Sequence, residues 1–291
     1  MPHQRRANVQ AIFEQDLFNF YCGDPVYELN LLLGRVSERF VTWMINTSKS
    51  LLRAAGFELR RVNPNSEEVG DFDLTSRKIF NWLKQFNIRT VLDIGANTGQ
   101  FAALIHKTLP DAMIYAFEPL KDCHEQLVER MKNAPRFKAF QFALGSEDVE
   151  INMHRSTYSP SSSIRPMSPL HEKAFPYTKG AVSEKITVKR LDDIAEGLTL
   201  TKNLLVKIDV QGFEDQVFAG GAQTIPKAKA LIVETSFERL YEGQPLFDEI
   251  YAITKRMGFV HHGNLSQLLS PVDGSVLQAD GIFIKANGTA D

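Results

Sequence analysis

An apolar strand, a glycine turn and the start of a helix follow one another in the stretch VLDIGANTGQF, residues 91–101. A short apolar run of this kind is typical of a strand that is buried on both faces of a parallel sheet. Gly95 and Gly99 permit a sharp turn that brings the backbone close to a ligand, and the helix that follows offers unpaired N–H groups at its first turn. The order predicts a nucleotide or nucleoside site at the carboxyl end of this strand.

Strand and helix patterns alternate on both sides of this stretch. We expect strands at residues 90–94, 113–117, 137–142, 204–209 and 230–235, and helices at residues 100–109 and 121–132. Short β-rich runs separated by helical patterns indicate βαβ units. The fold class is therefore α/β, with a doubly wound and mostly parallel sheet.

Two further regions interrupt or end this alternation. Strand patterns at residues 149–154 and 185–189 flank a Ser/Pro-rich loop, residues 156–168, which we interpret as a lid on the substrate side. After a helix at residues 247–257, the strand patterns at residues 259–262 and 281–285 are expected to form an antiparallel pair.

The N-terminal part has a different pattern. Apolar residues recur at three- and four-residue steps between Leu29 and Ile45, which indicates amphipathic helix, and a polar stretch at residues 63–71 has the composition of a linker. We therefore predict a helical accessory segment at residues 1–64 and a catalytic domain at residues 65–291. The basic end of the segment leaves three interpretations open: packing on the domain, self-association, or peripheral membrane contact through residues 1–60.

Charge and cysteine content limit the partners and the compartment. The net charge of −2 provides no basic footprint for a phosphate backbone, so nucleic acid is not an expected partner. Cys22 and Cys123 have no disulfide or zinc spacing, which favours a reduced, cytoplasmic compartment. The polar first ten residues argue against a cleaved signal peptide, and no apolar run approaches the ~20 residues of a membrane span.

The glycine turn favours one class of nucleoside ligand. Three residues separate Gly95 from Gly99, and Asp93 precedes both, which differs from the G-x-G-x-x-G spacing of dinucleotide sites. An acidic residue at this place repels a phosphate but attracts the cationic amino group of a methionine moiety. S-adenosylmethionine therefore fits this turn better than a dinucleotide does.

Acidic residues also stand at the ends of the later strands. Glu118 and Pro119 follow the second strand, where a carboxylate can accept hydrogen bonds from both ribose hydroxyls. VKIDVQGFE, residues 206–214, brings Lys207 and Asp209 to the end of the fourth strand, and Glu234 lies in the fifth. We take these three residues as catalytic candidates.

Two roles are open for the strand-end carboxylates. Asp209 acts either as a general base or, together with Glu234, as a ligand to a divalent cation such as Mg²⁺. The adjacent His261 and His262 are weaker candidates, because one of two neighbouring strand residues must point away from the site.

Several motifs occur in order: DIGANTGQF, FEP, FALG and KIDVQGFE, followed by the apolar strand with Glu234. Together they resemble the FkbM family of S-adenosylmethionine-dependent methyltransferases, from about Ile79 to Lys285. The resemblance implies a seven-stranded, Rossmann-like methyltransferase sheet and O-methylation of a sugar, glycan or secondary metabolite. A small-molecule or glycan acceptor is thus expected. The alternatives are a non-catalytic nucleoside-binding module on the same fold and, less favoured, a nicotinamide-dependent oxidoreductase.

The resemblance also assigns the cofactor contacts. It places the methionine part on the segment from Asp93 to Phe101, the ribose on Glu118 beside Pro119, and the adenine edge on Phe142, Ala143 and Leu144. Within the first segment the contact residues are Asp93, Gly95, Ala96, Asn97, Gly99 and Phe101. The serine cluster at residues 161–163 resembles a serine motif of the family, and the family more often has Glu where Gln211 stands.

Overall fold

The computed structural model describes residues 80–286. The predicted accessory segment at residues 1–64 and its boundary with the catalytic domain lie outside the described residues, so both stay predictions. Within residues 80–286, no helix combines the length and the apolar character that crossing a membrane requires.

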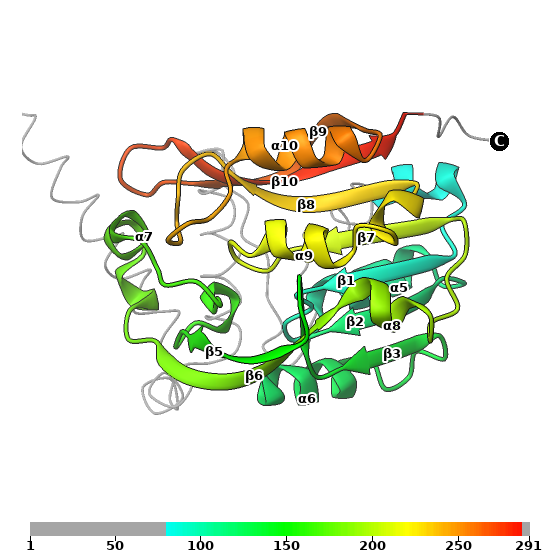
Figure 1. Cartoon of the computed structure of the whole chain (residues 1–291), viewed down its shortest axis with the longest axis horizontal. Helices are drawn as coiled ribbons and strands as arrows, with labels where there is room; N and C mark the ends of the chain where they lie inside the picture. Colours follow the sequence, from blue (N-terminus) through cyan, green and yellow to red (C-terminus); the bar gives the residue numbers. More distant parts are fainter. Residues whose placement is uncertain (1–79, 287–291) are drawn as a thin grey trace, which may run out of the picture. The chain divides into compact units, whose positions relative to one another are not determined.

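A seven-stranded sheet forms the centre of the described part, in the strand order β3-β2-β1-β7-β8-β10-β9 (Figure 1). The first five strands of this order pair in parallel, and β10 runs antiparallel to both of its neighbours. The predicted doubly wound, mostly parallel sheet is thereby confirmed. Its strands are β1 (Thr90–Ile94), β2 (Met113–Phe117), β3 (Phe137–Phe140), β7 (Leu204–Ile208), β8 (Ala230–Ser236), β9 (Phe259–Leu269) and β10 (Val276–Lys285).

Both faces of the sheet are covered, which explains why its central strands are apolar at consecutive positions. Leu92 and Val206 face a core that includes residues of α8, α9 and α10, whereas Val91 and Leu205 face a core with residues of η1, α5 and α6. The helices are η1 (Asn81–Phe86), α5 (Gln100–Thr108), α6 (Lys121–Arg130), α8 (Leu191–Ala195), α9 (Glu214–Gly220), η4 (Ile225–Lys227) and α10 (Phe247–Arg256). In Figure 1, α9 and α10 lie in front of the sheet.

The insertion between β3 and β7 forms a second sheet, in the order β4-β6-β5. Its elements are β4 (Ala143–Gly145), β5 (Val149–Arg155), η2 (Ser159–Ser161), α7 (Pro169–Ala174), η3 (Pro176–Thr178) and β6 (Val182–Arg190). The predicted strand at residues 137–142 is therefore two strands, of which β3 pairs with β2 and β4 with β6. Gly145 permits this second pairing, because a Cβ there would lie 2.7 Å from a methyl group of Val188.

The C-terminal strands pair antiparallel, as predicted, but both are longer than predicted. β9 lies at the edge of the sheet, and its residues after Phe259 are mostly half-buried or exposed. Polar side chains are tolerated on such a strand, so the apolar pattern alone underestimates its length.

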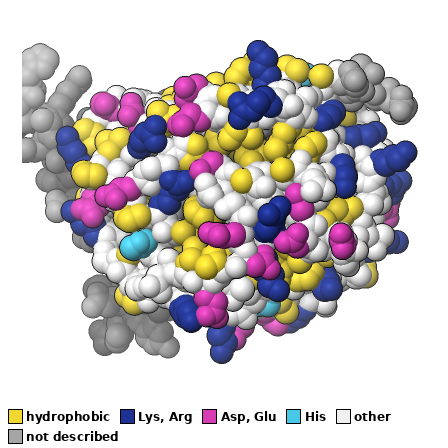
Figure 2. Space-filling view, viewed as in Figure 1, with side chains coloured by type: hydrophobic (Ala, Val, Ile, Leu, Met, Phe, Trp, Pro, Cys, Tyr) yellow, Lys and Arg dark blue, Asp and Glu magenta, His cyan; other side chains and the backbone are white. Residues whose placement is uncertain are grey.

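On the face shown in Figure 2, Lys and Arg side chains are interspersed with Asp and Glu.

Candidate active site

A cavity of about 530 Å³ opens at the carboxyl ends of β1, β2, β7 and β8. Ligands of doubly wound sheets bind at this edge. Most of the residues predicted from the sequence line the cavity: Gly95, Ala96, Asn97, Phe101, Glu118, Pro119, Ala143, Leu144, Lys207, Asp209 and Glu234. Asp93, Gly99, His261 and His262 do not line it.

Glu118 follows the last residue of β2 and is only 4% exposed. Its carboxylate accepts the backbone N–H of Asn97 at 2.8 Å and of Leu120 at 2.9 Å. Burial raises the pKa of Glu118 to about 7, although both backbone hydrogen bonds oppose the rise. Each carboxylate oxygen accepts one of these bonds and keeps further acceptor capacity. The side chain is therefore held in a fixed position on the cavity wall.

The two glycines of the turn serve contacts within the protein. Gly95 has φ +78°, and a Cβ there would lie 1.8 Å from the carbonyl oxygen of Asp209, so the β1 turn crosses the end of β7 at very short range. Gly99 has φ +87°, and its Cβ would lie 2.7 Å from Leu127 of α6. Gly99 thus begins α5 and packs on α6, and it does not line the cavity.

Lys207 and Asp93 form an ion pair beside the cavity. Lys207 Nζ lies 3.0 Å from the carbonyl oxygen of Gly95, 3.4 Å from Asp93 Oδ1 and 3.2 Å from Asp209 Oδ2. Burial lowers the pKa of Lys207, but Asp209 and Asp93 raise it, and the net shift is upward. Asp93 is fully buried and pairs with Lys207, which explains why it does not line the cavity.

Gln211 joins the two strand-end carboxylates. Its Nε2 donates to Asp209 Oδ1 at 2.9 Å and to the Glu234 oxygens at 3.0 and 2.8 Å. Its Oε1 accepts the Tyr241 hydroxyl at 2.8 Å, and its backbone carbonyl accepts the Ser163 hydroxyl at 2.6 Å. Burial raises the pKa of Glu234 well above its usual value, and the neighbouring carboxylate of Asp209 adds to the rise.

This arrangement does not fit the predicted metal site on Asp209 and Glu234. A divalent cation needs oxygen lone pairs directed at one point, whereas here an amide N–H donor faces both carboxylates. Within residues 80–286 there is also no group of three or more His, Cys, Asp or Glu side chains that could hold a metal ion.

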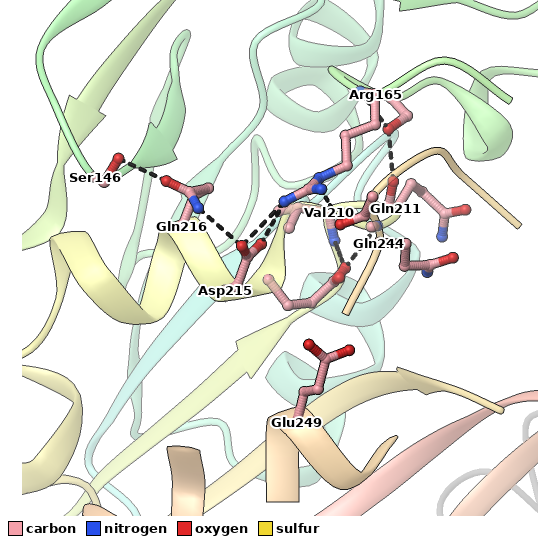
Figure 3. Close-up of polar contacts among 12 residues, drawn as sticks. Ser146, Arg165, Val210, Gln211, Asp215, Gln216, Gln244 and Glu249 are labelled. Carbon is pink, nitrogen blue, oxygen red and sulfur yellow. Dashed lines mark hydrogen bonds and ion pairs between the residues drawn. The ribbon is translucent and has the colours of Figure 1, made fainter. Parts of the chain in front are cut away.

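The loop at residues 156–168 lines one side of the cavity through Ser159, Pro160, Ser162 and Ile164. Arg165 fastens it to α9 by donating to both carboxylate oxygens of Asp215, at 2.9 and 3.0 Å (Figure 3). Gln216 donates to the same carboxylate at 2.8 Å and accepts the Ser146 hydroxyl at 2.8 Å. The loop predicted as a lid is thus tied to the core through buried and half-buried polar contacts.

Sequence reasoning missed Tyr241 and the residues that β9 and β10 contribute. Leu265, Ser266 and Asp280 line the cavity, and the Ser266 hydroxyl donates to the Asp280 carboxylate. Asp280 lies directly opposite Glu234 across the β8/β10 pair. The acidic residue within an otherwise uncharged stretch, VLQADGIF at residues 276–283, is the signal that could have identified it.

Comparison with known proteins identifies related sequences. Residues 93–260 match the model of the methyltransferase FkbM domain. The 2-O-methyltransferase NoeI of Sinorhizobium fredii is 33% identical over 162 residues, which cover 53% of this chain and 66% of that protein. The hexuronic acid methyltransferase AglP of Haloferax volcanii is 26% identical over 145 residues, covering 49% of this chain and 54% of that protein. The chain thus spans less than two thirds of the length of each relative.

A comparison of folds matches the crystal structure of EvdMO1 with a TM-score of 0.43 and 11% sequence identity. The match covers 83% of this chain and 48% of that one.

Proposed function

The chain belongs to the FkbM methyltransferase family, and from this premise we propose that it transfers a methyl group from S-adenosylmethionine to a hydroxyl group of a sugar. Two relatives support the acceptor class, since one is described as a 2-O-methyltransferase and the other as a hexuronic acid methyltransferase. The observation that carries the proposal is the buried carboxylate of Glu118 on the cavity wall.

The residues of the cavity fit this cofactor. Glu118 is fixed by two backbone N–H groups and has acceptor capacity left for both hydroxyls of a ribose. Ala143 and Leu144 supply an apolar wall for the adenine. When bound, S-adenosylmethionine supplies an activated methyl group on a sulfonium.

Asp209 is proposed to accept the proton of the acceptor hydroxyl. Its side chain is 30% exposed, and both Lys207 and Gln211 hold it at the end of β7. An alcohol is a weak acid, so its proton must leave as the new C–O bond forms, and a positioned base contributes ~10²–10⁴-fold to the rate. Glu234, both of whose carboxylate oxygens accept from Gln211, stands beside this base.

Incubation with S-adenosylmethionine that carries a ¹³C-methyl group tests the proposal. Sugars that gain the labelled methyl are detected by mass spectrometry, and fragmentation separates a methyl ether from a methyl ester. We expect a labelled methyl ether. Binding of the cofactor without transfer to any sugar would instead favour the non-catalytic module.

A further inference from the structure

Two carboxylate side chains from neighbouring strands line the cavity side by side. Glu234 of β8 and Asp280 of β10 are directly opposite residues of an antiparallel pair, and both line the cavity. Like charges at directly opposite positions destabilise a sheet. Burial raises the pKa of each of the two carboxyl groups, and Asp209 raises both further. An arrangement that costs stability is typical of a functional site.

These carboxylates lie far from the proposed ribose contact. Glu118 ends β2 and Asp280 lies in β10, and the strands β1, β7 and β8 separate them in the sheet. At a strand spacing of ~4.8 Å, the two positions are about 19 Å apart. One end of the cavity therefore suits the nucleoside, and the Glu234/Asp280 end is left for the acceptor.

Among residues 80–286, no free cation balances the acidic end of the cavity. Lys207 is the one basic side chain that this part of the chain contributes to the cavity lining. An ammonium group has three donor hydrogens. Three protein oxygens, of Gly95, Asp93 and Asp209, lie within 3.4 Å of Lys207 Nζ and occupy them. A carboxylate or phosphate on the acceptor would thus meet carboxylates and no available donor of positive charge from the described residues.

Sugar hydroxyls, by contrast, can donate hydrogen bonds to these carboxylates. We propose that Glu234 and Asp280 form the acceptor subsite for an uncharged sugar and exclude sugars whose ring carries a carboxylate or phosphate. This inference rests on the proposed function and adds the charge class of the substrate. Asp280 is the specificity-determining residue within the pair, because Gln211 donates to both oxygens of Glu234, whereas Ser266 donates to only one oxygen of Asp280.

Matched pairs of sugars test the inference. The probes are the methyl glycosides of glucose, galactose and mannose, each compared with the methyl glycoside of the corresponding uronic acid at saturating S-adenosylmethionine. Each pair differs only by a carboxylate in place of a CH₂OH group. Because juxtaposed like charges cost several kcal/mol, we expect the neutral member to have a kcat/KM on the order of 10²-fold higher.

The variant Asp280→Asn tests whether Asp280 causes the preference for the neutral sugar over the uronic acid. Removing one of the two carboxylates should reduce the preference for the neutral sugar by about tenfold. It should also raise the thermal unfolding midpoint, because the like-charge pair is gone. Titration with S-adenosylmethionine verifies that the variant is folded. Asp111→Asn is the matched control, since Asp111 is 77% exposed and lies outside the cavity lining, and it should leave the preference unchanged.

The outcomes separate the two levels of the proposal. Uronic acids methylated as efficiently as their neutral partners would overturn the inference and leave the proposed function intact. An unchanged preference in Asp280→Asn would likewise overturn the role of Asp280. If no sugar of either series were methylated although S-adenosylmethionine binds, the proposed function itself would fail, and the inference with it.

Discussion

The substitution Glu118→Gln changes the charge of a side chain that is only 4% exposed while keeping its shape. The pKa of Glu118 is raised from 4.5 to about 7 in the folded protein. Below pH 4.5 the carboxyl is protonated in both the folded and the unfolded chain. Between pH 4.5 and 7 the unfolded chain releases the proton and the folded chain retains it, so the free energy of unfolding falls as the pH rises.

The size of this effect follows from the two pKa values. A rise from 4.5 to about 7 corresponds to about 3 kcal/mol, all of which is lost above the folded pKa. The amide of the variant stays uncharged and avoids that loss. However, an amide has one acceptor oxygen, so a backbone N–H of Asn97 or Leu120 loses its partner, at a cost of ~1–3 kcal/mol. We therefore expect the variant to be less stable than the parent at pH 4.5 and of similar or higher stability at pH 8.5.

Urea unfolding of both proteins across pH 4.5–8.5, without cofactor, measures this difference. The parent and the variant share all other titrating groups, so subtraction isolates Glu118. Glu125→Gln is the control, because Glu125 is exposed on α6. A difference in unfolding free energy that does not change with pH would refute the reasoning that burial raises the pKa of Glu118.

The other predictions concern catalysis, the close approach of Gly95 to the backbone of Asp209, and the accessory segment. Asp209→Asn should bind S-adenosylmethionine like the parent but turn over ~10²–10⁴-fold more slowly. A chelator should have no effect on the rate of the parent. If single-turnover assays gave the variant the same rate as the parent, Asp209 would not be the base. Gly95→Ala places a Cβ at 1.8 Å from the carbonyl oxygen of Asp209 and should lower the free energy of unfolding in urea by ~4 kcal/mol or more. Gly180 has φ +91° but open space around it, so Gly180→Ala should lower that free energy by only ~1–2 kcal/mol. Equal losses in the two variants would contradict the close approach of Gly95 to Asp209. A chain beginning at Asn65 should still bind cofactor by calorimetry, and a wholly unfolded product would show that the predicted boundary is wrong.

The central sheet was predictable because its inner strands are buried on both faces. β1, β7 and β8 are short apolar runs with few interruptions, so composition and length identify them. The break between Phe140 and Ala143 was not predictable in this way, because β4 continues the apolar run but pairs with a strand about forty residues later. The length of β9 was underestimated because an edge strand need not be apolar, so its polar residues do not show the apolar pattern of a strand.

The lining of the cavity was predictable where its residues follow the end of a strand. Glu118 and Asp209 follow the last residues of β2 and β7, and the topology of parallel sheets brings such residues to one edge. Asp280 was missed because it lies within an antiparallel strand whose register with β8 is a long-range property. The roles of Gly95 and Asp93 depend on which backbone and which cation lie opposite, and no local pattern encodes either.

A crystal structure of the complex with S-adenosylhomocysteine tests the central claim most directly. The account predicts that the ribose hydroxyls lie within hydrogen-bonding distance of the Glu118 carboxylate, that the adenine lies beside Ala143 and Leu144, and that the Glu234/Asp280 end of the cavity stays open for a sugar. A nucleoside bound at the Glu234/Asp280 end, or outside the cavity with Glu118 unoccupied, would contradict it.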